Sequence, residues 1–365
     1  MNDARRIRVL RLTGSPRERG LAHGRAYAEA IRRYTEERVH LAADGSWAGR
    51  PVTRADVLAL AEEMLPAHRA YAPDLYEEMV ALAEAAGISA AEAVIVGGFT
   101  DFVDTVRARS EAAAHAAPAS PALEAELDDC TAILTPNILA QTWDMHDSAT
   151  EHVVMLDIDD AVPSWVFTTV GCVAQIGMNA AGIAIGINNL AATDGRVGVT
   201  WPFVVRKVLQ ATTLEAARAA IADAPLAGGH NYLVLDAHGQ GFNVEAMPTH
   251  ATFEPLEDRP LVHANHCVVP AARAREAARS PSLLESSHAR HARAVQLSAG
   301  PLDADALMAF TRDPTICRRS EAPYHVESSG AVVMSPGTRE LWAVWGIPVD
   351  HPFERFTFTA GKTRP

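Results

Sequence analysis

The spacing of hydrophobic residues changes at residue 130. Before it, from Pro16 to about Arg109, hydrophobic residues recur three and four positions apart, as from Leu58 to Leu65, and this spacing predicts amphipathic helices. Gly20 and Gly24 lie inside the first of these stretches, where glycine indicates close contact with a neighbouring backbone. From 130 to 200, short runs of strand-forming residues separated by turn formers predict an antiparallel sheet.

The remainder of the chain shows both kinds of spacing. Helices are predicted over Val204–Ile221 and Ser282–Leu297, a hairpin over 231–247, and two strands over 331–347. Successive blocks of helices and strands are typical of an α+β fold. We therefore expect helices that cover two packed antiparallel sheets.

Composition limits the kind of partner. The 365 residues are 48% hydrophobic, enough for one large domain or two ordinary ones with a substantial core. The 32 basic and 45 acidic residues give a net charge of −13, which argues against binding to nucleic acid or anionic lipid. We expect a small-molecule substrate, with no nucleic-acid or membrane partner. Charges interrupt the apolar residues near the N-terminus, so no signal peptide is predicted and a cytoplasmic location is expected.

One segment differs from its surroundings in composition. Residues Ser110–Asp129 are rich in Ala, Ser, Pro and Glu and offer little for a core to bury, which predicts an exposed linker. The linker ends directly before Cys130. We therefore divide the chain into a mainly helical pro-segment, residues 1–129 with the linker at 110–129, and a β-rich part, residues 130–365, that begins at Cys130.

Cys130 opens a predicted strand. Cleavage of the Asp129–Cys130 peptide bond would free an α-amine on the residue that carries the thiol. Such an amine titrates at about 7.7–8.0 and can take the thiol proton near neutral pH, so one residue would supply both nucleophile and base. Before cleavage, the thiol can attack the Asp129 carbonyl in an intramolecular acyl shift. Judged on residue type alone, Cys130 is instead a small buried hydrophobe.

Two polar residues are candidates to assist this cysteine. Asp144 lies on what is predicted to be the next strand, which would bring it back toward Cys130, although a strand-end carboxylate can also make a turn contact. Asn265 lies at the end of a predicted strand, and its amide can donate a hydrogen bond to the oxyanion of a tetrahedral intermediate. His263 and His266 flank Asn265. Alternation along the strand would place His263 and Asn265 on one face and His266 on the other, with no acidic residue nearby in sequence, so we expect neither a metal site nor a cofactor.

Short motifs follow one another along nearly the whole chain. They are GSPRERGLAHG at 14–24, DCT at 129–131, QTWD at 141–144, IGMNAAGIAIGINNL at 176–190, GHNYLVLDA at 229–237, HANH at 263–266 and ICR at 316–318. The motifs are loose individually but specific in combination. Together they resemble the motifs of the peptidase C45 family, which includes acyl-coenzyme A:6-aminopenicillanic acid acyltransferase and β-alanyl-dopamine hydrolase.

The resemblance implies a four-layer αββα N-terminal nucleophile (Ntn) hydrolase fold. It also implies self-cleavage before Cys130 and two processed subunits that stay associated. By the same resemblance Cys130 is the nucleophile, Asp144 orients the cysteine and its amine, and Asn265 helps to form the oxyanion hole. Arg318 is carried over as a substrate-binding residue, and Thr131 as one that positions the new terminus. A surface arginine and an ordinary strand threonine are the alternatives for these last two.

Three positions depart from the pattern of the resembling families. Asp129 stands where the penicillin-type enzymes have glycine before the cysteine, so the rate of processing is open. Thr142 replaces an asparagine. Gln141 stands three residues before the aspartate, where bile-salt hydrolases and ceramidases typically have arginine, and this favours the acyltransferase branch.

The resulting hypothesis is a cysteine amidohydrolase or N-acyltransferase. It would act on a small N-acyl substrate through an acyl thioester on Cys130, which water or an amine resolves. The sequence leaves hydrolysis and transfer both open. Two alternatives remain: a ceramidase-like or bile-salt-hydrolase-like amidase, and an uncut, non-catalytic binding protein on the same fold.

Overall fold

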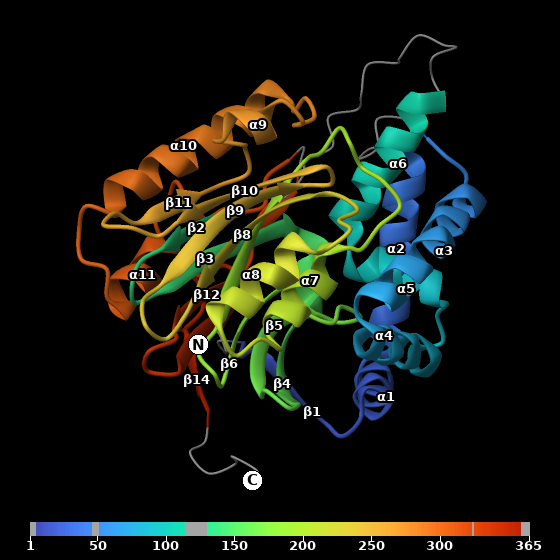
Figure 1. The fold of residues 1–365 in the computed structure, drawn as a ribbon, viewed down its shortest axis with the longest axis horizontal. Helices are drawn as coiled ribbons and strands as arrows, with labels where there is room; N and C mark the ends of the chain where they lie inside the picture. Colours follow the sequence, from blue (N-terminus) through green and yellow to red (C-terminus); the bar gives the residue numbers. More distant parts are fainter. Residues whose placement is uncertain (1–4, 46–50, 114–129, 323–324, 359–365) are drawn as a thin grey trace.

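The computed structural model describes residues 5–45, 51–113, 130–322 and 325–358. Two β-sheets form its centre, and helices cover them on both sides (Figure 1).

The larger sheet has eight strands in the order β1-β4-β5-β6-β7-β8-β9-β10. All neighbours pair antiparallel except β1 and β4, which are parallel. The strands are β1 (Arg8–Thr13), β4 (Val153–Asp159), β5 (Ser164–Thr169), β6 (Ile176–Asn179), β7 (Ala184–Leu190), β8 (Gly229–Leu235), β9 (Gly241–Met247) and β10 (His250–Pro255).

The smaller sheet has six antiparallel strands in the order β11-β2-β3-β12-β13-β14. Its strands are β2 (Thr131–Leu134), β3 (Leu139–His146), β11 (Leu261–His263), β12 (Val326–Ser335), β13 (Glu340–Trp345) and β14 (Glu354–Thr357). A short 3-10 helix, η1 (Asp147–His152), follows β3.

Three groups of helices surround the sheets (Figure 1). The N-terminal group packs beside the larger sheet and consists of α1 (Pro16–Ala26), α2 (Ala28–Asp44), α3 (Arg54–Tyr71), α4 (Pro73–Ala86), α5 (Ala90–Gly97) and α6 (Phe99–Ala113). Two further helices, α7 (Trp201–Val208) and α8 (Leu214–Ala222), join β7 to β8. The third group is α9 (Pro270–Arg273), α10 (Pro281–Leu297) and α11 (Ala304–Phe310), of which α10 and α11 cover the smaller sheet.

The inner faces of the two sheets meet closely at Gly186 of β7. A Cβ atom at this position would lie 2.4 Å from Oε1 of Gln141 and 2.8 Å from Cδ2 of Leu139, both on β3. Strand residues alternate between faces, so Asn188 shares the inner face with Gly186 while Asn189 faces the helices.

No single helix among the described residues is both long and apolar enough to cross a membrane, although the sharply bent pair α4 and α5 passes the same test when joined.

The predicted α+β fold of two packed sheets covered by helices is confirmed. The close helix contact predicted at Gly20 and Gly24 is also present, because Cβ atoms there would lie 2.1 Å from the Glu78 carbonyl oxygen and 2.3 Å from that of Leu82, both on α4.

One strand was not predicted, and three details of the sequence-based prediction are wrong. The unpredicted strand is Arg8–Thr13, which precedes the helices and pairs with β4. That pair is parallel, so the larger sheet is not wholly antiparallel. The helix predicted over Val204–Ile221 is two helices, since the chain turns between Val208 and Leu214. The first four residues of the predicted linker, 110–113, belong to α6, because Ala and Glu favour helix; residues 114–129 lie outside the described residues.

Candidate active site

The candidate nucleophile lies at the start of the smaller sheet, between the two sheets. Cys130 directly precedes β2 and is 1% exposed. β2 and β3 pair antiparallel, with Thr131 opposite Thr142, and this pairing returns the chain to Cys130. The Cys130 thiol donates to the backbone oxygen of Asp144 over 3.9 Å. The predicted hairpin contact between Cys130 and Asp144 is therefore present, and Asp144 is completely buried.

Asn265 reaches the same region from a loop. β11 ends at His263, so the prediction that His263 and Asn265 share one strand face is wrong. The Asn265 backbone nitrogen donates to Oγ of Ser287 at 2.9 Å, and its Nδ2 donates to the Asn189 carbonyl oxygen at 3.2 Å. The side chain is completely buried, as an oxyanion donor shielded from water requires.

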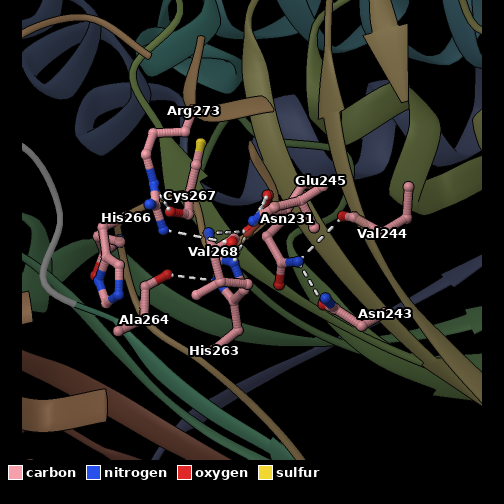
Figure 2. Close-up of polar contacts among 12 residues, drawn as sticks. Asn231, Asn243, Val244, Glu245, His263, Ala264, His266, Cys267, Val268 and Arg273 are labelled. Carbon is pink, nitrogen blue, oxygen red and sulfur yellow. Dashed lines mark hydrogen bonds and ion pairs between the residues drawn. The ribbon is translucent and has the colours of Figure 1, made fainter. Parts of the chain in front are cut away.

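The loop that carries Asn265 is held by the carboxylate of Glu245 on β9 (Figure 2). Glu245 accepts hydrogen bonds from Nε2 of His263 at 2.9 Å, from the Val268 nitrogen at 2.6 Å and from the Val269 nitrogen at 3.0 Å. Both the carboxylate and the imidazole are completely buried. This carboxylate fixes the two ends of the loop, and Asn265 lies between them.

Sequence reasoning missed Arg290 on α10. Its Nη1 donates to the Cys130 carbonyl oxygen at 2.7 Å and to Oγ1 of Thr131 at 2.9 Å, and its Nη2 donates to Oδ1 of Asn265 at 3.1 Å. The residue is 1% exposed. The available signal was helical spacing, since Ser286, Ser287 and Arg290 fall on one face of the predicted helix.

Thr131 and Arg318, the two residues predicted to bind substrate or position the terminus, both connect to this cluster. The Thr131 backbone nitrogen donates to Oγ1 of Thr142 at 3.2 Å, while its hydroxyl accepts from Arg290. Nη1 of Arg318 donates to Oγ of Ser286 at 3.2 Å, and Nε of Arg290 donates to the same oxygen at 3.3 Å. Arg318 is half-buried rather than fully on the surface.

A surface pocket of about 580 Å³ opens beside Arg318. Arg312, Cys317, Arg318 and Arg319 are among its lining residues. The Ser328 hydroxyl accepts from the Arg318 backbone nitrogen at 2.9 Å, and Ser328 is the strand partner of Asp144. Arg318, which lines the pocket, is thus bound to the strand that pairs with Asp144.

The negative charge of Asp144 also affects the pKa of a cysteine that lines the pocket. Burial, and then the charge of Asp144, raise the pKa of the Cys317 thiol to about 11. Burial raises the pKa of Cys172 to about 11, and burial with the charges of Glu276 and Glu245 raises that of Cys267 further. These three thiols are held protonated near neutral pH, which suits buried, unreactive cysteines.

The structure describes Gln141 but not Asp129. The side-chain amide of Gln141 bonds to the backbone of Ile187 on β7, so it connects the two sheets. Asp129, the residue before the predicted cut, lies outside the described residues.

Among the described residues, no group of three or more His, Cys, Asp or Glu side chains is arranged to hold a metal ion. Near Asn265, the ring of His266 instead packs against those of His288 and His291, with ring centres 4.1 and 5.4 Å away.

Comparison with known proteins gives a family for this arrangement. The model of the family described as acyl-coenzyme A:6-aminopenicillanic acid acyl-transferase matches residues 133–328, more than half of the chain. The 40 kDa form of acyl-coenzyme A:6-aminopenicillanic-acid-acyltransferase from Emericella nidulans is 26% identical over 298 residues, which cover 79% of this chain and 76% of that relative.

Two solved structures are similar at low sequence identity. Penicillin V acylase from Agrobacterium tumefaciens has a TM-score of 0.36 and 11% identity, and the match covers 60% of this chain and 82% of the acylase. A point mutant of the conjugated bile acid hydrolase from Clostridium perfringens has a TM-score of 0.44 and 9% identity, and the match covers 64% of this chain and 97% of the hydrolase.

Proposed function

Because the chain belongs to the acyl-coenzyme A:6-aminopenicillanic acid acyl-transferase family, we propose that it is a self-cleaving cysteine amidohydrolase or N-acyltransferase for a small N-acyl substrate. The observation that carries this proposal is the convergence of Cys130, Asp144 and Asn265. Cys130 directly precedes β2, Asp144 lies on β3 and Asn265 on a distant loop, and each is at most 1% exposed. The Asp144 backbone oxygen accepts from the Cys130 thiol, and Arg290 donates both to the Cys130 carbonyl oxygen and to Oδ1 of Asn265.

Activation would proceed by an acyl shift at the Asp129–Cys130 bond. The Cys130 sulfur attacks the Asp129 carbonyl carbon, the peptide nitrogen leaves as the α-amine of Cys130, and a thioester joins the two residues. Water then hydrolyses the thioester, which leaves a carboxylate on Asp129 and returns the thiol. The contact between the thiol and the Asp144 backbone supports this step, because it fixes the direction of the sulfur.

Turnover would use the same sulfur with its own amine as the base. The amine takes the thiol proton as the sulfur attacks the substrate carbonyl, and it returns that proton to the leaving amine. The amide of Asn265 would stabilise the oxyanion that forms on the carbonyl. An acyl thioester on Cys130 remains, and water or an acceptor amine resolves it. Asp144 would hold the new terminus in place.

The substrate would enter from the pocket beside Arg318. Three arginines line this pocket, and each of them has a partner. Arg319 pairs with Asp350 at 2.8 Å, Nε of Arg312 donates to the Pro348 carbonyl oxygen at 2.9 Å, and Nη1 of Arg318 donates to Oγ of Ser286 at 3.2 Å. Arg318 is joined through Ser286 to the guanidinium that touches Cys130. This connection favours Arg318 as the residue that binds the polar end of the substrate.

Denaturing gel electrophoresis and intact-mass measurement of the purified protein test the proposal. Wild-type protein should give two fragments, residues 1–129 and 130–365, while Cys130→Ala should stay intact and inactive. Exposure to a panel of N-acyl amines should add an acyl mass to the fragment that begins at Cys130. A continuous wild-type chain that never acquires an acyl group would sink the enzymatic proposal and favour a binding protein.

A further inference from the structure

We infer that Arg290 is a positioning residue of this site, which fixes the orientation of the Asn265 amide and the start of β2. The inference rests on the proposed function of the site. It adds a residue on a helix that neither the motifs nor the comparisons assign to any role.

The contacts of Arg290 join three parts of the site that are far apart in sequence. One guanidinium nitrogen reaches both Cys130 and Thr131, at 2.7 and 2.9 Å, and the other terminal nitrogen reaches Asn265 at 3.1 Å. Because a guanidinium is planar and its donors are fixed relative to one another, these bonds set the position of Asn265 relative to the nucleophile. A change in the position of α10 would therefore change both at once.

The direction of the Asn265 amide follows from these contacts. A carboxamide has an oxygen and a nitrogen that differ little in size, so two flipped orientations fit most sites. Arg290 donates only, so the group facing it must be the oxygen, and the NH2 group must then point the other way. One hydrogen of that group goes to the Asn189 carbonyl at 3.2 Å, and the other is the donor for an oxyanion. The flipped amide would instead present its oxygen to the oxyanion, which is repulsive.

Burial makes this arrangement rigid. Arg290 is 1% exposed, and its Nε donates to Ser286 at 3.3 Å, so the side chain is held at its base as well as at its tip. The loop end of the contact is held independently by Glu245 through the Val268 and Val269 nitrogens. Arg290 thus acts on an amide whose backbone is already fixed, and its remaining effect is on the direction of the side chain.

The test compares Arg290→Met and Arg290→Lys with Arg293→Met, a control on the same helix. Arg293 pairs with Asp313 at 2.7 Å and its side chain is 39% exposed, so its removal leaves the contacts of Arg290 in place. For Arg290→Met we expect kcat to fall about 10- to 100-fold with KM unchanged, because the loss is confined to an interaction made in the transition state. Arg290→Lys should recover part of the loss, since an ammonium still donates to the amide oxygen. Unchanged kcat in Arg290→Met would overturn the inference.

The double variant of Arg290→Met with Asn265→Ala separates positioning from a purely structural role. Because both changes disturb the same amide, the double variant should lose less activity than the product of the two single losses. Losses that multiply would contradict the inference. Should Arg290→Met fail to fold, the same comparison is made with Arg290→Lys, which keeps the charge.

A further measurement tests the role of Arg290 even if the proposed function fails. If wild-type protein neither cuts itself nor acquires an acyl group, the proposed function fails. The positioning role of Arg290 can then be tested without any substrate. The test measures the rate at which iodoacetamide alkylates Cys130, followed by peptide mass mapping. This rate should change in Arg290→Met and not in Arg293→Met, and an equal rate in both would overturn the positioning role.

Discussion

The side-chain amide of Gln141 pairs with both backbone groups of Ile187. Oε1 accepts from the Ile187 nitrogen at 2.7 Å, and Nε2 donates to the Ile187 carbonyl oxygen at 3.0 Å. Gln141 lies on β3 and Ile187 on β7, so one buried side chain joins the two sheets as a neighbouring strand would. Gly186 makes this possible, because any Cβ there would overlap the Gln141 amide.

Removing this amide should destabilise the fold. Gln141→Ala leaves a buried N–H and a buried C=O of Ile187 without their partner, and each such group costs about 1–3 kcal/mol. We expect the free energy of unfolding to fall by about 2–6 kcal/mol, measured by urea denaturation. Gln296→Ala, at an exposed position of α10, is the control and should change stability by less than about 0.5 kcal/mol. Equal stabilities of the two variants would contradict the role given to Gln141.

Gly20→Ala should also destabilise the protein, through the contact between α1 and α4. A methyl group at Gly20 would lie 2.1 Å from the Glu78 carbonyl oxygen, and backbone cannot move aside cheaply. Gly97, the last residue of α5, is the matched control because its Cβ would meet nothing closer than 3.8 Å. Gly97→Ala should be neutral or stabilising by up to about 1 kcal/mol, since alanine favours helix over glycine. Thermal unfolding of both variants checks the difference, and a Gly20→Ala protein as stable as wild type would refute it.

Local patterns explain which parts of the site could be predicted. Cys130 and Asp144 lie on strands joined by a short turn, so alternation and turn residues suffice to place them together. The glycines of α1 carried their own signal, because glycine inside a helix needs a packing reason. These features depend on residues close in sequence.

The parts that were missed depend on contacts between distant residues. Arg290 reaches Cys130 only because α10 covers the smaller sheet. Spacing within the helix shows which residues share a face with Arg290, but not which strand that face meets. Asn265 was placed on a strand that ends two residues earlier, where Glu245 of another strand binds the loop backbone. The strand Arg8–Thr13 needs β4 as a partner, which lies far along the chain. Spacing along one segment contains none of this information.

Asn188 and Asn179 should respond in opposite ways to replacement by leucine. Both are completely buried, but neither amide atom of Asn188 has a partner among the described residues. A buried amide without partners costs free energy, so Asn188→Leu should raise stability by about 1–2 kcal/mol. The amide of Asn179 donates to the Leu209 and Ala211 carbonyls at 2.9 and 2.7 Å and accepts from the Ile183 nitrogen at 2.9 Å.

Asn179→Leu removes all three bonds and leaves buried backbone groups unpaired. We expect a loss of about 2–5 kcal/mol from this change. Urea denaturation of the two variants side by side measures the contrast. A destabilised Asn188→Leu protein would mean that this amide has a structural partner in solution.

Stability should fall as the pH drops from about 6.5 to about 4, because two buried imidazoles join the N-terminal helices to the rest of the chain as acceptors. Nε2 of His68 accepts from the Thr200 nitrogen at 3.1 Å, while its Nδ1 donates to the Met64 carbonyl oxygen at 2.9 Å. Nε2 of His23 accepts from the Gly171 nitrogen at 3.3 Å. Burial lowers the pKa of each imidazole from 6.5 to about 4. Both rings are therefore neutral in the folded protein near pH 7.

Proton uptake determines whether acid raises or lowers the stability. Between these two pH values the unfolded chain binds protons at both positions and the folded chain does not, so acid favours unfolding. Each residue contributes about 1.4 kcal/mol per pH unit over this range, and nothing further below the folded pKa. Urea denaturation at pH 7 and pH 5 should show the loss, and equal stabilities would contradict it.

In protein cut before Cys130, the same protonation acts between the two fragments. Size-exclusion chromatography should then show residues 1–129 separating from residues 130–365 in acid and remaining bound at neutral pH.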